Sequence, residues 1–179
     1  MGNGRFGFRN RYEVTCYKNV WEDGRLIQIP KWKEYIFNLV TLEVLNDVLG
    51  VYFQGDTQAT TWYILLFDSD STPAGGWTYA NIGTDFTEFT DYDETTREEW
   101  VDGTIASQLL DNSASPAEFT ASTSVNTTIY GTAMVNVSTK GDNSSPSGLI
   151  FNAARFSSAR PFAETETIKV VLTVNAQDV

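Results

Sequence analysis

The chain has 179 residues, a formal net charge of −11 and 41% hydrophobic residues, proportions typical of a single folded domain. It contains no histidine, which excludes Ser–His–Asp and Cys–His catalytic sites and removes the commonest metal ligand. Cys16 is the one cysteine, so an intrachain disulfide and a cysteine zinc site are excluded as well. We therefore expect no enzymatic activity, cofactor or metal.

Charge is distributed unevenly along the chain. Residues 1–33 carry seven basic and three acidic side chains, whereas residues 34–179 carry five basic and twenty acidic ones. A basic segment on an acidic body favours contact with an anionic protein surface. The overall negative charge disfavours sequence-specific nucleic-acid binding.

Residues 1–10 contain three glycines, which oppose regular structure. We predict an extended N-terminal arm here, followed by one domain over residues 11–179. Aromatic and basic side chains alternate with glycine along this segment, a pattern suited to contact with another subunit. The predicted partner-binding residues are Arg5, Phe6, Phe8, Arg9 and Arg11.

The next segment alternates as a half-buried strand does, with Tyr12, Val14 and Cys16 on one face. Cys16 is therefore predicted to be a small buried residue and not a nucleophile. We expect a turn over residues 19–24 and a second extended segment over residues 25–29 that Pro30 interrupts.

One short helix is predicted over residues 41–53. Leucines at 42, 45 and 49 follow the 3.6-residue period, Thr41 is a suitable N-cap, and Gly50 is expected to end or loosen the last turn.

The remaining chain has the pattern of β-strands separated by turns. Residues 61–68 are apolar and aromatic, as in a buried central strand, and residues 68–83 form a long loop. Turn residues at 111–113, 140–143 and 157–161 separate the later strands. The predicted strands are residues 105–110, 117–122, 128–139, 148–157 and 165–175. This spacing predicts an all-β antiparallel sandwich of jelly-roll or immunoglobulin-like type.

Acidic residues gather between Asp85 and Asp102 beside Trp77 and Trp100. Paired carboxylates with an aromatic platform are features of glycoside hydrolases and sugar-binding clefts. The interspersed threonines favour a solvated surface instead. Trp77 and Trp100 are nevertheless predicted contacts for a ligand or a neighbouring subunit.

One segment of the sequence partly matches the pattern of a calcium-binding loop. Residues 68–72 present oxygen ligands at alternate positions, as an EF-hand loop does. Pro73 occupies the position of the required glycine and Tyr79 that of the final glutamate, so the EF-hand pattern fails.

Several short segments occur in a characteristic order along the chain: residues 10–14, 38–41, 61–64, Trp77, residues 86–92, Arg97, Trp100, residues 112–114, 119–120, 128–131 and 138–141. This order resembles that of small β-rich virion proteins of tailed bacteriophages. These segments cover most of the chain, and none is a catalytic signature. The loop over residues 68–83 departs from the family pattern, having a TPAGG sequence where an alanine-rich segment is expected.

The resemblance implies a structural virion protein, such as a capsid decoration (cement) protein or a head–tail component. The expected partners are major capsid, portal, connector or tail subunits and further copies of the same chain. No secretory signal or bilayer-spanning run is visible, so we expect synthesis in the host bacterial cytoplasm and incorporation into the virion. A carbohydrate-binding module of a tail fibre is the alternative.

Overall fold

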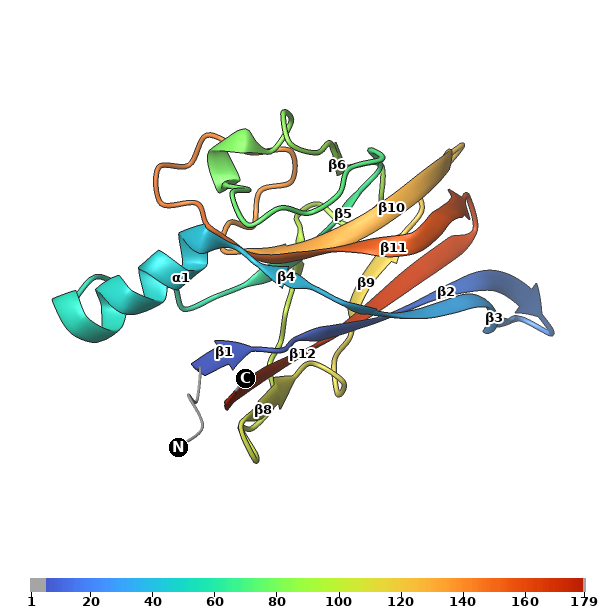
Figure 1. Cartoon of the computed structure of the whole chain (residues 1–179). Coiled ribbons are helices and arrows are strands. Elements are labelled where there is room, and N and C mark those ends of the chain that lie inside the picture. Colours follow the sequence, from blue (N-terminus) through green and yellow to red (C-terminus); the bar gives the residue numbers. More distant parts are fainter. Residues whose placement is uncertain (1–5, 179) are drawn as a thin grey trace.

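Two antiparallel β-sheets pack face to face in the computed structural model, which describes residues 6–178 (Figure 1). The first sheet consists of β1 (Phe6–Phe8), β2 (Arg11–Glu22), β3 (Arg25–Phe37), β8 (Leu109–Asp111), β9 (Ala117–Thr120) and β12 (Glu166–Asp178). The second consists of β4 (Leu39–Val40), β5 (Tyr63–Phe67), β6 (Glu88–Phe89), β7 (Glu98–Glu99), β10 (Asn126–Val135) and β11 (Ile150–Ala163). The predicted all-β sandwich with one short helix is confirmed.

The main core lies between the sheets and follows from strand alternation. Tyr12, Val14 and Cys16 all point inward, as predicted, because every second side chain of a strand faces the same side. Their neighbours across the ladder on β12 are also completely buried. The three cross-strand pairs are Tyr12–Leu172, Val14–Val170 and Cys16–Ile168.

A second, smaller core covers the outer face of the second sheet. The segment between β5 and β6 includes the 3-10 turn η2 (Tyr79–Asn81), and its aromatic residues pack onto Phe67. The sheet is therefore buried on both faces at β5. This explains why β5 is a continuous apolar run instead of an alternating one.

The turn between β2 and β3 is tighter than predicted. β2 continues to Glu22, and Asp23 and Gly24 alone form the turn, with φ angles of 49° and 75°. Two consecutive positive φ angles belong to a type I′ hairpin, for which Asp-Gly is a preferred sequence.

Two predicted interruptions, the break at Pro30 and the turn over residues 157–161, lie inside strands. Pro30 lies inside β3 at a bulge, where Cys16 pairs with Trp32 and Tyr17 with Pro30. Because β3 is the last strand of its sheet order, a residue without an N–H is tolerated there. Residues 157–161, predicted as a turn, belong to β11, and the chain reverses only near Thr165, whose φ is 70°.

The predicted helix is formed by α1 (Leu42–Leu49) and a following π-helical turn, η1 (Gly50–Gln54). The Thr41 hydroxyl accepts a hydrogen bond from the Val44 N–H, so the predicted N-cap is confirmed. Gly50 does not end the helix, because its backbone is right-handed helical. The chain leaves the helix at Gly55, with a left-handed φ of 78°.

The described part of the predicted N-terminal arm is a strand of the first sheet. Phe8 pairs with Ala176 in the same register that pairs Arg11 with Thr173, and the Arg9 N–H donates to the Asn175 carbonyl at 2.9 Å. β1 is thus a continuation of β2 along β12. Residues 1–5 of the arm, including Arg5, lie outside the described residues.

Gly131 provides a test of this packing. A Cβ added there would collide with the Phe67 ring and the Ala154 carbonyl oxygen on the two neighbouring strands. We expect Gly131→Ala to lower the free energy of unfolding by about 1–3 kcal/mol in urea denaturation. Gly76→Ala, with no atom within 4 Å of the added Cβ, is the matched control and should be near neutral. Equal stability of the two variants would contradict this packing.

Candidate interaction surfaces

The start of α1 is fixed to the sandwich, and the rest of the helix leaves it. The Leu42 N–H donates to the Gly75 carbonyl at 2.8 Å, and the Glu43 carboxylate accepts from the Ile150 N–H at 2.8 Å. Val44 is buried. Beyond this turn α1 and η1 project away from the two sheets at one end of the molecule (Figure 1).

The projecting part of the helix forms one wall of an apolar groove. Its residues, which we call the helix groove, are Phe8, Leu45, Val48, Leu49, Tyr52 and Phe53. The groove measures about 540 Å³. Tyr52 and Phe53 are 82% and 79% exposed. Large exposed apolar side chains grouped in this way are a feature of binding surfaces.

The 3.6-residue period therefore predicted the helix but not its orientation. The leucines that carry the period, at 42, 45 and 49, are all exposed, whereas an amphipathic helix normally turns its apolar face to the core. The face that would be buried in an ordinary monomer is here available to another molecule.

A second apolar surface lies at the turn between β2 and β3. It consists of Val20, Trp21, Leu26, Ile27 and Ile29 and is called the hairpin tip below. Trp21 is 73% exposed, and Leu26, Ile27 and Ile29 are exposed too. β12 pairs with β2 only as far as Lys18, so beyond Asn19 the hairpin is two-stranded and extends past the sandwich (Figure 1).

The sequence analysis missed this surface. The sequence signal that could have revealed the hairpin is Asp23-Gly24 between two apolar-rich segments. This pattern is among the strongest short indications of a hairpin. A turn placed over residues 19–24 instead removes Val20 and Trp21 from the strand.

The predicted partner-binding residues are divided between two places. Phe8 lines the helix groove and packs edge-on against Phe151, with ring centroids 5.6 Å apart. Arg9 and Arg11 lie along the first sheet, over the rings of Phe37 at 5.0 Å and Tyr35 at 5.3 Å. Of Phe6, the structure describes the backbone, which pairs with Asp178.

Trp77 and Trp100 are buried, contrary to the expectation of a surface contact. Trp77 is 5% exposed and stacks on Phe86 with a centroid distance of 4.6 Å. Trp100 is 7% exposed and donates its indole N–H to the Leu172 carbonyl at 3.1 Å. Neither ring forms an open platform for a sugar, so both tryptophans serve the cores.

The acidic run contains a buried ion pair, which the expectation of a solvated surface did not include. Arg97 is 1% exposed and binds Glu88 through two hydrogen bonds, Nε to Oε1 at 2.8 Å and Nη2 to Oε2 at 2.6 Å. Burial alone would lower the pKa of Arg97, but Glu88 and Tyr79 raise it above the ordinary value. The guanidinium therefore stays charged and neutralises Glu88.

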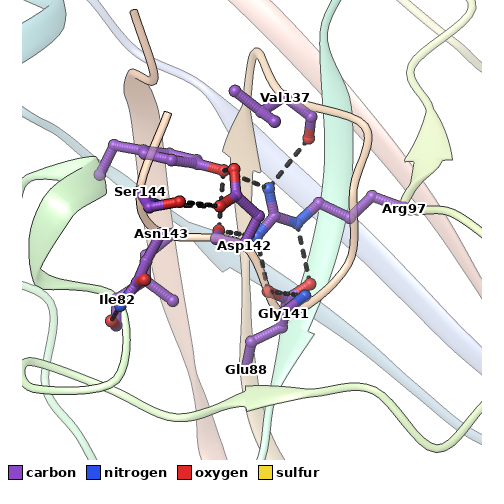
Figure 2. Close-up of polar contacts among 9 residues, drawn as sticks. Ile82, Glu88, Arg97, Val137, Gly141, Asp142, Asn143 and Ser144 are labelled. Carbon is purple, nitrogen blue, oxygen red and sulfur yellow. Dashed lines mark hydrogen bonds and ion pairs between the residues drawn. The ribbon is translucent and has the colours of Figure 1, made fainter. Parts of the chain in front are cut away.

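This ion pair fastens a loop to the second sheet. Arg97 also donates to the carbonyls of Val137 at 2.9 Å and Asp142 at 2.7 Å, and the Gly141 N–H donates to Glu88 at 3.0 Å (Figure 2). Both members of the pair thus help to hold the chain after β10. A carboxylate engaged in this way is not available as a general acid or base.

The loop that fails the EF-hand pattern uses its oxygen atoms in internal contacts. Asp70 pairs with Arg155, and the Ser69 hydroxyl accepts from the Thr87 N–H at 2.8 Å. Within residues 6–178 no three acidic or cysteine side chains form a group able to hold a metal ion.

No protein-family model matches the chain. A search of curated proteins also found no match. In the described part of the chain, no helix has the length and apolarity needed to span a bilayer.

Breaking the buried pair should be costly. We expect Arg97→Met to lower the free energy of unfolding by about 3–5 kcal/mol, because it leaves the Glu88 carboxylate buried without a counter-charge. Replacing both Arg97 and Glu88 by methionine should recover part of the loss. Arg155→Met, which removes an exposed pair, is the control and should cost about 1 kcal/mol or less. Equal losses for Arg97→Met and Arg155→Met in urea denaturation would contradict the role of the pair.

Glu34 gives the stability a pH dependence. Burial would raise the pKa of Glu34, but hydrogen bonds from Ser157 and the ion pair with Arg160 hold this pKa below its ordinary value. The ionised form thus stabilises the fold above the unfolded-state pKa, and this contribution is lost as pH falls through the folded-state pKa.

We expect Glu34→Gln to cost about 1.5–3 kcal/mol at neutral pH. The difference from wild type should shrink between about pH 5 and pH 3, because the unfolded chain binds a proton at this carboxyl before the folded state does. Urea denaturation across this range measures both curves. A difference independent of pH would show that the charge of Glu34 is not responsible.

Proposed function

We propose that the protein is a structural component of a tailed-phage virion that binds neighbouring shell, connector or tail proteins without covalent chemistry. It would act as a capsid decoration (cement) protein or a head–tail component. The sequence resemblance supports the virion assignment. The helix groove is the observation that carries the binding role.

The groove has the composition of a binding hot spot. Its walls are apolar, and two aromatic rings, those of Tyr52 and Phe53, stand exposed at its end. Aromatic side chains dominate the energy of protein interfaces when a partner buries them. Burial of each ring contributes about 1.5–3 kcal/mol by transfer from water.

Binding through this preformed groove also avoids most of the conformational-entropy cost that a flexible arm would have on becoming ordered. An extended arm that folds on binding loses about 1–2 kcal/mol of conformational entropy per residue. Phe8 is already held in β1 by pairing with β12, and α1 is already capped by Thr41. A preformed surface of this kind keeps more of its contact energy as affinity.

The alternative function, a carbohydrate-binding module, has less support. Its two aromatic candidates, Trp77 and Trp100, are buried in the cores, and Glu88 of the acidic run is neutralised by Arg97. Trp21, which is 73% exposed, lies on a hairpin opposite Leu26 and among aliphatic residues.

Occupancy of purified phage particles tests the proposal. Particles assembled with wild-type protein should contain it in fixed stoichiometry by quantitative mass spectrometry. Phe53→Asp should lower this occupancy by about tenfold or more, because a charge enters the groove.

Ile105→Asp is the matched control, since Ile105 is 71% exposed and does not line the groove, and its occupancy should be unchanged. Absence of the wild-type protein from particles would refute the proposed function. Equal occupancy of wild type and Phe53→Asp would refute the role of the groove.

A further inference from the structure

We propose that the outer face of the first sheet binds single-stranded nucleic acid independently of its sequence. The site, which we call the aromatic–basic face, consists of Arg9, Arg11, Lys33, Tyr35 and Phe37. The inference goes beyond the proposed virion role, because it assigns a ligand to a surface that is separate from the helix groove. It is carried by the spacing of the rings and by the cations beside them.

Strand alternation places these side chains together on the outside of the sandwich. Tyr12 on β2 and Ile36 on β3 are cross-strand partners that are buried between the sheets, so the residues on either side of them point outward. The rings of Tyr35 and Phe37 are accordingly 54% and 64% exposed. The segment that covers the second sheet, between β5 and β6, lies on the opposite side of the molecule (Figure 1).

The rings and the arginines form two equivalent modules. The Arg9 guanidinium lies 5.0 Å from the centroid of the Phe37 ring, and the Arg11 guanidinium lies 5.3 Å from that of Tyr35. The modules are two residues apart along the chain on both sides, which is about 6.8 Å in a β-strand. Contact with the rings also holds the guanidinium groups in place, so less conformational entropy is lost when a ligand binds.

This repeat suits a polymer in which planar and anionic groups alternate. Each nucleotide of a single strand supplies a base, which stacks on an aromatic ring or a guanidinium plane, and a phosphate, which attracts an arginine. Along one strand of a duplex the bases are about 3.4 Å apart, half the separation of the modules, so only an unstacked strand fits. The carboxylates of an acidic protein would pair with the arginines but make no use of the two rings.

The cations nearest the rings are not neutralised. Neither Arg9 nor Arg11 forms an ion pair within residues 6–178. Lys33 also lies over the Tyr35 ring, at 5.0 Å, and it pairs with Glu13 at 2.5 Å. The aromatic–basic face therefore has one acidic side chain against three basic ones, and both arginines are available to phosphates.

The other charges of the outer face lie farther across the sheet. Lys169 and Glu118 pair at 2.6 Å and cancel each other. Asp111 on β8 is separated from Arg11 by Thr173 of β12, and it accepts a hydrogen bond from the Ser113 N–H at 2.8 Å. The acidic body repels nucleic acid elsewhere, so binding is confined to the aromatic–basic face and weakens as salt screens the phosphates.

Binding of a labelled oligo(dT) of about twelve nucleotides to the whole chain, measured by fluorescence anisotropy at low salt, tests the site. Tyr35→Leu and Phe37→Leu should each weaken binding about fivefold or more, because leucine keeps an apolar side chain but has no π-face for a base. Phe53→Leu is the matched control, since Phe53 is 79% exposed in the helix groove, and its affinity should equal that of the wild type.

The salt dependence tests the arginines without altering the rings. In a plot of log affinity against log salt, Arg11→Gln should make the slope shallower by about 0.7, because one phosphate fewer is neutralised. Arg25→Gln removes the same charge at the turn between β2 and β3, and it should leave the slope unchanged. Equal slopes for wild type and Arg11→Gln would overturn the proposal.

Four further results would also overturn it. The first is an absence of oligo(dT) binding by the wild type at low salt, and the second is equally tight binding of a duplex of the same length. The third is displacement of oligo(dT) by poly-glutamate at equal charge, which would identify an acidic protein surface as the ligand. The fourth is a wild-type dimer in sedimentation that Phe37→Leu dissociates, which would identify the face as a contact between copies. Unchanged melting temperatures of the variants show that a loss of binding is not a loss of the fold.

Discussion

The pairing of β2 with β12 is the interaction on which the rest of the structure depends. It joins residues near the two ends of the chain, and its inward side chains, from Tyr12–Leu172 to Cys16–Ile168, form the centre of the main core. The same ladder continues into β1, which brings Phe8 to the helix groove, and it stops at Lys18, where the hairpin begins to project. Both apolar surfaces therefore begin at the two limits of one ladder. Because this pairing spans most of the sequence, the loop-closure cost of folding is high and we expect folding to be slow for a domain of this size.

The sequence predicted those features that depend on local pattern. The alternation of apolar residues predicted the inward face of β2, and the apolar run over residues 61–68 predicted the buried strand β5. The position of Thr41 before the leucine period predicted the helix cap. The errors occurred where proline was taken as a break but tertiary structure accommodates the residue. Pro30 fits a strand at the end of a sheet, whereas Gly50 loosens the helix, as one of its two expected effects, since the helix continues from there as a π turn to Gln54. Such accommodation depends on neighbours distant in sequence, which local spacing does not reveal.

The candidate site was predicted only in part, for the same reason. Phe8, a predicted partner-binding residue, lines the helix groove, but the arm that was expected to carry it is a strand. Trp77, Trp100 and Glu88 have the composition of a binding cleft, yet long-range packing and the Arg97 ion pair bury all three. Conversely, the leucines of α1 have the spacing of a core-facing helix and are exposed. Composition thus identified aromatic and acidic groups without showing which of them the fold would leave accessible.

The bulge at Pro30 has a consequence for the way in which molecules of this protein meet at high concentration. β3 pairs with β2 on one side, and in the described part of the chain no strand covers its other side. An open strand of this kind invites edge-to-edge joining of sheets and, at high concentration, fibrous aggregation. Pro30 lacks one of the N–H groups that such joining needs, and Lys31 and Lys33 place charge beside it. The long bare edge is thereby kept from recruiting further strands, so that in the proposed structural role neighbouring molecules would meet through side-chain contacts alone.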